Sequence, residues 1–242
     1  FSGSGVLTST AAALGCSTLP VDWKANRHEQ KARATNIDLT TGSGQAELGA
    51  LCRRLFRKTG KVIIWLAPPC GTASRARGVP LKAGVAQGKL PMPLRTEKRP
   101  WGKDGLAEQG QTEVDKVAAA NVLYACVVNF IVHMPACSTW VVENPTGSFM
   151  WDLPGFKGLA DGADVFDADV TMCNFGADRD KRTRLRSNSR LLCSMSGKCT
   201  REHSHRHVDD EGRTELHKPW GLCRRSGWAT AHEAQCPEHF CK

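Results

Sequence analysis

The sequence contains neither a signal-peptide pattern nor an apolar run that we expect to cross a membrane. Without a secretory segment, its 11 cysteines, an odd number, argue against a secreted disulfide scaffold. We expect reduced thiols instead, some of them bound to a metal. The sequence therefore predicts an intracellular monomer, nuclear if the source is eukaryotic, with no membrane partner.

Acidic residues are scarce beside basic ones, since 24 Asp and Glu stand against 33 Lys and Arg. The resulting net charge of +9 favours a polyanionic partner. At 242 residues the chain can form one main domain and a small appendage. We expect the main domain at residues 1–192 and a Cys/His-rich extension at residues 193–242.

The stretch KVIIWLAPPCGTAS, residues 61–74, contains an apolar run that is long enough for one buried strand. The run stops before Pro68 and Pro69, which cannot continue a sheet ladder, so Cys70 is expected at the carboxyl end of the strand. Ligands bind at that edge of open α/β sheets. Gly71, which follows Cys70, can adopt backbone conformations that other residues rarely adopt. The thiol is therefore either placed for chemistry or is a small buried hydrophobe in a turn.

A Phe-x-Gly-x-Gly turn opens the chain, formed by Phe1, Gly3 and Gly5. An Ala-rich stretch to about Gly15 follows and is expected to be helical. A glycine loop that leads into a helix N-terminus lets the backbone approach a nucleotide closely. If Phe1 directly follows a first strand, as such a turn requires, we expect that strand to lie mostly outside the sequence given.

Two aspartates follow the next predicted strands. Residues 17–21 have the pattern of a strand that ends in Asp22 and Trp23, and residues 35–39 form another that carries Asp38 near its end. A helix over about residues 45–58 then leads to the central strand, which completes β-α-β-α-β spacing. An acid in such a position bonds ribose hydroxyls in doubly wound folds, and an exposed turn aspartate is the alternative.

Residues 71–110 form a basic segment that is rich in Gly and Pro and has little apolar periodicity. Its side chains are suited to phosphate contacts, and the alternative is a solvated loop whose charges only confer solubility. The basic residues are Arg75, Arg77, Lys82, Lys89, Arg95, Lys98, Arg99 and Lys103. Helical periodicity returns at residues 112–133, where a core helix is expected.

A second strand-to-loop junction lies at residues 138–148, where an apolar strand runs into Glu143, Asn144 and Pro145. If both junctions belong to one sheet, Glu143 and Cys70 face the same crevice. A carboxylate beside a thiol nucleophile suits addition to an electron-poor ring.

Another strand is predicted at residues 164–173, and a basic run follows it. Because we place this run between two apolar strands, we expect it to contact an anion or a base, and a solvated face is the alternative. Its members are Arg179, Lys181, Arg182, Arg184, Arg186 and Arg190.

In their order, these motifs resemble those of the DNA (cytosine-5) methyltransferases. The motifs are Phe1-x-Gly3-x-Gly5, Asp22, Asp38, Pro68-Pro69-Cys70, Glu143-Asn144-Pro145 and Arg182-x-Arg184. The resemblance covers about residues 1–192 and implies a Rossmann-like α/β fold that uses S-adenosylmethionine as methyl donor, with DNA as partner. The family usually has Val in place of Pro145 and Gln in place of Asp180.

The resemblance also implies a role for each motif. Cys70 would attack carbon 6 of a flipped cytosine, Glu143 would bond the N3 side of the ring, and Arg182 and Arg184 would brace the base and the reacting centre. The residues expected to bind the methyl donor are Phe1, Gly3, Gly5, Asp22, Trp23, Asp38 and Pro68. The residues expected to contact DNA are Arg75, Arg77, Arg179 and Lys181.

Cysteine and histidine are concentrated in the extension, where Cys-x3-His-x-His could supply three or four ligands to Zn²⁺. Histidines two apart on a strand point to the same face, so they could converge on one ion. A solvated His-rich loop is the alternative. The candidate ligands are Cys193, Cys199, His203, His205 and His207.

The sequence thus predicts methylation of carbon 5 of cytosine in DNA through a covalent Cys70 adduct. One alternative is a catalytically decayed, methyltransferase-like module that binds nucleic acid and carries a metal-binding tail. Another Rossmann-type enzyme that uses a nicotinamide or a different acceptor would explain the glycine turn but not the two junctions.

Overall fold

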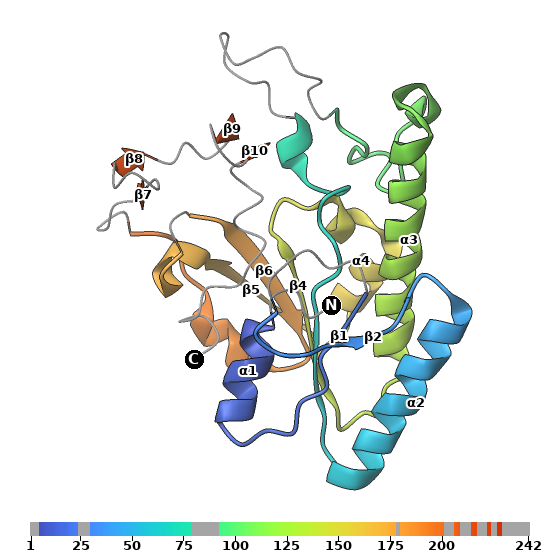
Figure 1. Ribbon diagram of the computed structural model, residues 1–242, viewed down its shortest axis with the longest axis vertical. Helices are drawn as coiled ribbons and strands as arrows, with labels where there is room; N and C mark the ends of the chain where they lie inside the picture. Colours follow the sequence, from blue (N-terminus) through green and yellow to red (C-terminus); the bar gives the residue numbers. More distant parts are fainter. Residues whose placement is uncertain are drawn as a thin grey trace.

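The computed structural model describes residues 5–23, 30–78, 92–177 and 180–200, and the backbone of four short strands that follow them. Figure 1 shows the helices and strands in chain order. They are α1 (Val6–Ala13), β1 (Val21–Asp22), β2 (Thr35–Asn36), α2 (Gly42–Thr59), β3 (Ile63–Leu66), η1 (Arg75–Gly78), η2 (Leu106–Gln109), α3 (Gln111–Val132), β4 (Thr139–Pro145), η3 (Phe149–Asp152), α4 (Pro154–Ala160), β5 (Phe166–Thr171), η4 (Met172–Phe175), β6 (Arg182–Ser187), η5 (Arg190–Met195), β7 (Arg206–Val208), β8 (Thr214–Leu216), β9 (Leu222–Cys223) and β10 (Gly227–Trp228).

The central sheet has four strands in the order β3-β4-β6-β5. β3 and β4 are parallel, whereas β6 is antiparallel to both β4 and β5. β1 and β2 form a separate parallel pair, which within the described residues is not hydrogen-bonded to β3. The predicted α/β class is therefore confirmed, with a mixed central sheet.

Helices α3 and α4 cover one face of the sheet. Tyr124 and Val127 of α3 and Phe156 of α4 are buried against Trp140 and Val142 of β4. The rings of Tyr124 and Phe156 meet edge to face with their centroids 6.3 Å apart. This cluster holds the helix layer against the strand that carries Glu143.

Helix α1 covers the opposite face through a second apolar cluster. Val6 packs with Val141 of β4, Val170 of β5 and Leu185 of β6. Alternate residues of β4 thus face different helix layers, as the two-residue period of a strand requires. The sheet is therefore sandwiched between α1 and the α3–α4 layer.

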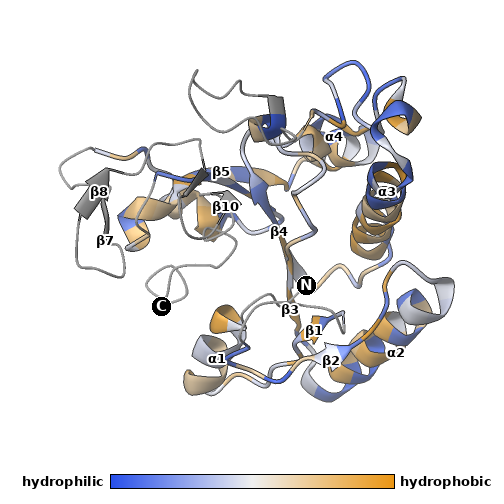
Figure 2. Ribbon diagram, turned by 45° about the horizontal axis from the view of Figure 1, so that its top comes forward, coloured by the Kyte–Doolittle hydropathy of each residue, from blue (hydrophilic) through white to orange (hydrophobic). Residues whose placement is uncertain are grey.

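Helix α3 is the core helix predicted at residues 112–133. By length and composition alone it could also cross a membrane, although no such span is expected from the sequence. Figure 2 shows that most of its length is hydrophobic. Because Val117, Tyr124, Val127 and Ile131 are buried in this structure, its apolar side packs into the core.

The basic run at residues 179–190 was expected to lie between two strands, but its middle part, residues 182–187, is itself strand β6. Thr183, Leu185 and Ser187 are fully buried and alternate with the arginines. This alternation is the period of a strand, and it places the arginines on one face of the sheet. The prediction was wrong because the arginines dominate the composition of the segment.

In the extension, β7 pairs with β8 and β9 with β10, both antiparallel. His203 and His205 lie outside the described residues, and for His207 only the backbone, in β7, is described. The predicted convergence of these histidines therefore stays a prediction.

Candidate active site

The loop after β3 carries Cys70, and three hydrogen bonds hold its backbone. Asn144 Nδ2 donates to the carbonyl oxygen of Pro68 at 2.8 Å, and Tyr124 Oη donates to that of Pro69 at 2.7 Å. The amide of Ala73 donates to the carbonyl of Cys70 at 2.9 Å. The thiol is therefore attached to a backbone that is tied to both β4 and α3.

A buried arginine supports this loop from the other side. Arg95 is 1% exposed, and its Nη2 donates to Thr72 Oγ1 at 3.1 Å, while its Nη1 donates to Asn121 Oδ1 at 2.7 Å. Its guanidinium also lies 5.3 Å from the centre of the Tyr124 ring. The expectation that Arg95 is a phosphate contact or a solvated loop residue was wrong, because it is enclosed beneath the Cys70 loop.

Tyr124 is the central member of this support. Burial raises the pKa of Tyr124 to about 12, although the nearby charge of Arg95 and a hydrogen bond with Thr72 oppose the increase. The phenol is therefore a neutral donor at physiological pH. Sequence reasoning assigned Tyr124 no role, since its helical spacing predicts only a core residue.

Glu143 lies on β4 within reach of the Cys70 loop. Leu66 of β3 pairs with Val142, so Glu143 stands one step beyond the end of β3, where the loop to Cys70 begins. Its side chain is 20% exposed, and its Oε1 lies 3.9 Å from Nζ of Lys181. Burial raises the pKa of the carboxyl, and the charge of Lys181 opposes that increase.

Cys70 interacts electrostatically with both of these side chains. Burial raises the pKa of the Cys70 thiol, Lys181 lowers it, and Glu143 raises it further. The structure thus brings Cys70, Glu143 and Lys181 together, although 73 positions separate the first two in the sequence. A thiol, a carboxyl and an ammonium in one site can supply a nucleophile, a proton donor and a counter-ion.

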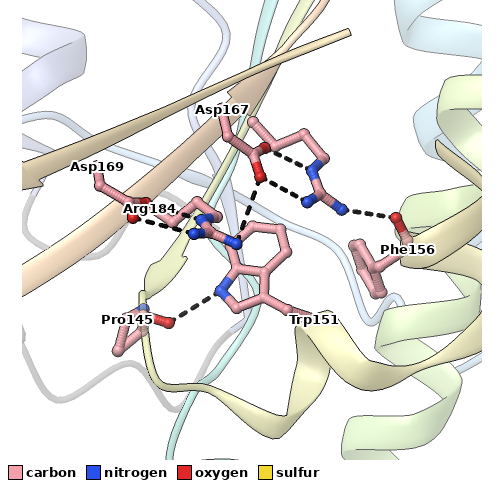
Figure 3. A network of polar contacts seen from close by, with 7 residues as sticks. Pro145, Trp151, Phe156, Asp167, Asp169 and Arg184 are labelled. Atoms are coloured by element: carbon pink, nitrogen blue, oxygen red, sulfur yellow. Dashed lines mark hydrogen bonds and ion pairs between the residues drawn. The ribbon is translucent and has the colours of Figure 1, made fainter. Parts of the chain in front are cut away.

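Arg184 is not part of this group. On β6 it stands opposite Asn144, whereas Leu185 stands opposite Glu143, so Arg184 and Glu143 leave the sheet on opposite faces. Figure 3 shows that its guanidinium turns to the acids of β5, with Nε 2.7 Å and Nη2 2.9 Å from the carboxylate of Asp169. The structure therefore does not support the expected role of Arg184 in bracing the base.

Arg182 shares the face of Arg184, because the two are two residues apart on one strand. It stands opposite Thr171 of β5 and is exposed. Like Arg184, it does not lie on the face from which Glu143 projects, so the structure does not support a catalytic role for it.

Arg186 forms the buried part of the same network. Its side chain is 6% exposed and makes a two-pronged pair with Asp167, at 2.6 and 2.7 Å. Its Nη1 donates to the carbonyl of Phe156 at 2.6 Å, and its guanidinium lies 5.0 Å from the centre of the Trp151 ring. These contacts join β5, β6 and α4, so this arginine is a structural residue.

The residues expected to bind the methyl donor are found at element ends. Gly5 has φ +71° at the start of α1, and a Cβ there would lie 3.0 Å from the backbone of Ala32. Asp22 is buried at the end of β1, and the next residue, Trp23, is 59% exposed. Asp38 Oδ1 accepts hydrogen bonds from the amide and hydroxyl of Thr40, just before α2 begins. Pro68 is buried in the Cys70 loop, whereas Phe1 and Gly3 lie outside the described residues.

Two of the residues expected to contact DNA are paired with acids. Arg77 Nη2 lies 2.9 Å from Glu113 Oε2, and Arg75 Nη2 lies 3.1 Å from Asp152 Oδ2. Arg77 is only 21% exposed and attaches η1 to α3, so its contacts are structural. The Arg75 side chain is 46% exposed, and its guanidinium also lies 4.2 Å from the centre of the Phe149 ring. Arg179 lies outside the described residues, and Lys181 belongs to the site above.

The cysteines expected to bind zinc have a neighbour that the sequence analysis did not include. Cys173, in η4 directly after β5, hydrogen-bonds with Cys199, and burial together with this thiol raises the pKa of Cys173 to about 12. Thr171 Oγ1 donates to the carbonyl of Gly197 at 2.9 Å, which aligns the two segments. Within the described ranges, no group of three or more potential metal ligands is present.

No family model, no curated protein and no solved structure matches this chain.

Proposed function

We propose that this chain transfers a methyl group from S-adenosylmethionine to carbon 5 of cytosine in DNA. The observation that carries the proposal is the grouping of Cys70, Glu143 and Lys181 at the carboxyl end of β3. The order of the sequence motifs supports it, and the mixed α/β sheet is compatible with it.

The three side chains suit a reaction in which sulfur adds to a ring. Carbon 5 of cytosine is a poor nucleophile until a thiolate adds at carbon 6. The bond from Cys70 Sγ to carbon 6 forms as the electron pair of the ring double bond moves toward N3, which takes a proton from Glu143. After carbon 5 has received the methyl group, solvent removes the proton from carbon 5, and the electron pair of that bond forms the double bond to carbon 6 as the Cys70 thiolate leaves. N3 then returns its proton to the Glu143 carboxylate. Because the ring is stacked in duplex DNA, the base must first leave the stack.

The methyl donor supplies an electrophilic carbon when it is bound. Asp22 and Trp23 suit its nucleoside part, because a buried carboxylate at a strand end can accept hydrogen bonds from hydroxyls and an exposed indole can stack on adenine. Gly5 allows the backbone at Ala32 to lie close to the start of α1, since a Cβ at residue 5 would be 3.0 Å from that backbone.

Trapping on modified DNA tests the proposal. A duplex that contains 5-fluorocytosine, incubated with the protein and S-adenosylmethionine, should give a covalent protein–DNA band on a denaturing gel, because fluorine cannot leave as a cation. Cys70→Ser should abolish the band, and Cys52→Ser, on α2, should retain it. Absence of the band from the wild-type protein would overturn the assignment.

A non-catalytic nucleic-acid-binding module is the second candidate, and the basic surface of α2 favours it. Arg53, Arg54, Arg57 and Lys58 are all exposed at the end of this helix. DNA binding that weakens with salt, without any covalent band, would select this alternative.

A further inference from the structure

We propose that Lys181 is the counter-ion of the site and that it keeps one negative charge shared between Cys70 and Glu143. This inference deepens the proposed function, since it names the cation that the reaction requires. The sequence had assigned Lys181 to DNA contact and the catalytic positive charge to Arg182 and Arg184.

The register of β6 places Lys181 in the site. Leu185 stands opposite Glu143 and Thr183 stands opposite Pro145. Lys181 continues this row of alternate residues, so it lies on the face from which Glu143 projects. Its Nζ lies 3.9 Å from Glu143 Oε1, and its side chain is 21% exposed.

Two groups in the site can carry negative charge, and each disfavours the charge of the other. Burial raises the pKa of both Cys70 and Glu143, while the charge of Lys181 lowers both. One ammonium can compensate one anion, so the favoured states are a thiolate beside a carboxylic acid and a thiol beside a carboxylate. Among the described residues, Tyr124 of α3 also interacts with Cys70, and it stays neutral.

The reaction then moves the anion without changing the net charge of the site. A proton passes from Cys70 to Glu143, which leaves a thiolate beside Lys181. As sulfur adds to carbon 6 of the ring, Glu143 passes this proton on to N3 and becomes a carboxylate beside the same ammonium. The positive charge of Lys181 is therefore balanced before and after the bond forms.

The alkylation rate of Cys70 tests the inference without DNA or methyl donor. Iodoacetamide reacts with the thiolate, and trypsin releases Cys70 in residues 62–75, where it is the only cysteine, so mass spectrometry can follow it alone. In Lys181→Met the midpoint of the pH–rate profile should rise by about one pH unit or more, which slows alkylation about tenfold at a fixed pH below the midpoint. Lys181→Arg should restore the profile, and Lys157→Met, on the exposed side of α4, should leave it unchanged.

Glu143→Gln provides an independent variant, should Lys181→Met not fold. Removal of the neighbouring acid should lower the midpoint, which is the opposite direction. Superimposable profiles for wild type and Lys181→Met, or an unchanged midpoint in Glu143→Gln, would overturn the inference. A shifted profile without a covalent band on fluorinated DNA would uphold the counter-ion and reject the methyltransferase.

Discussion

Truncation of Asp167 to alanine should destabilise the protein far more than the same change at Asp169. Asp167 accepts two hydrogen bonds from Arg186, whose side chain is only 6% exposed, and its loss would leave that guanidinium with the carbonyl of Phe156 as its remaining hydrogen-bond acceptor among the described residues. Breaking a buried ion pair in this way costs about 3–5 kcal/mol. Since Asp167 is 31% exposed, water can enter, and we expect the lower end, about 3 kcal/mol.

Asp169→Ala is the matched control on the same strand. Its pair with Arg184 is more exposed, at 39% and 25%, and Arg184 keeps a contact to Asp167 at 3.3 Å. The expected loss is about 1 kcal/mol or less. With a urea slope of about 2 kcal/mol per molar, the two midpoints should differ by about 1 M.

Urea unfolding followed by tryptophan fluorescence measures these midpoints, since Trp151 lies against Arg186. The double variant Asp167→Ala with Arg186→Met should recover part of the loss, because it leaves no buried charge unpaired. Equal midpoints for the two aspartate variants would refute the conclusion that Arg186, rather than Arg184, is the buried structural arginine.

Three further outcomes are expected. Tyr124→Phe removes the hydrogen bond to Pro69 and should lower stability by about 1 kcal/mol in thermal unfolding, with little change in the fold seen by circular dichroism. The thiol of Cys173 has a pKa that is raised above its unfolded value to about 12, so its contribution to stability is complete below about pH 9 and is lost as the pH rises toward 12; Cys173→Ala should flatten the decline of the unfolding free energy between pH 9 and 10. Gly44→Ala should destabilise α2 by about 1–3 kcal/mol, because a Cβ there would overlap the carbonyl oxygen of Asp38, whereas Gly42→Ala, with open space around it, should not; equal melting temperatures would contradict this.

The end of β3 could be predicted because its signal is local, an apolar run followed by prolines. The apolar residues before Glu143 located β4, but the predicted junction there was wrong, because the strand continues through Glu143 and Asn144 to Pro145, which all pair with β6. The helix at residues 112–133 was found for the same reason, since its period is visible in the sequence itself.

The membership of the site depended on contacts between distant segments. Lys181, Arg182 and Arg184 are alike in charge and close in sequence, so composition cannot separate them. The register between β4 and β6 separates them, because it places Lys181 on the face of Glu143 and Arg184 on the opposite face. Likewise, nothing near Arg95 in the sequence indicates that it is buried beneath the Cys70 loop.

The sequence by itself therefore determined the α/β class, the end of β3 and the presence of β4, and it singled out Cys70 and Glu143, which interact in the structure. Only the tertiary structure decided which cation accompanies them and which arginines are structural. The physical reason is that strand ends and helical periods depend on neighbouring residues, whereas the face of a sheet on which a side chain lies depends on strand pairing across the whole chain.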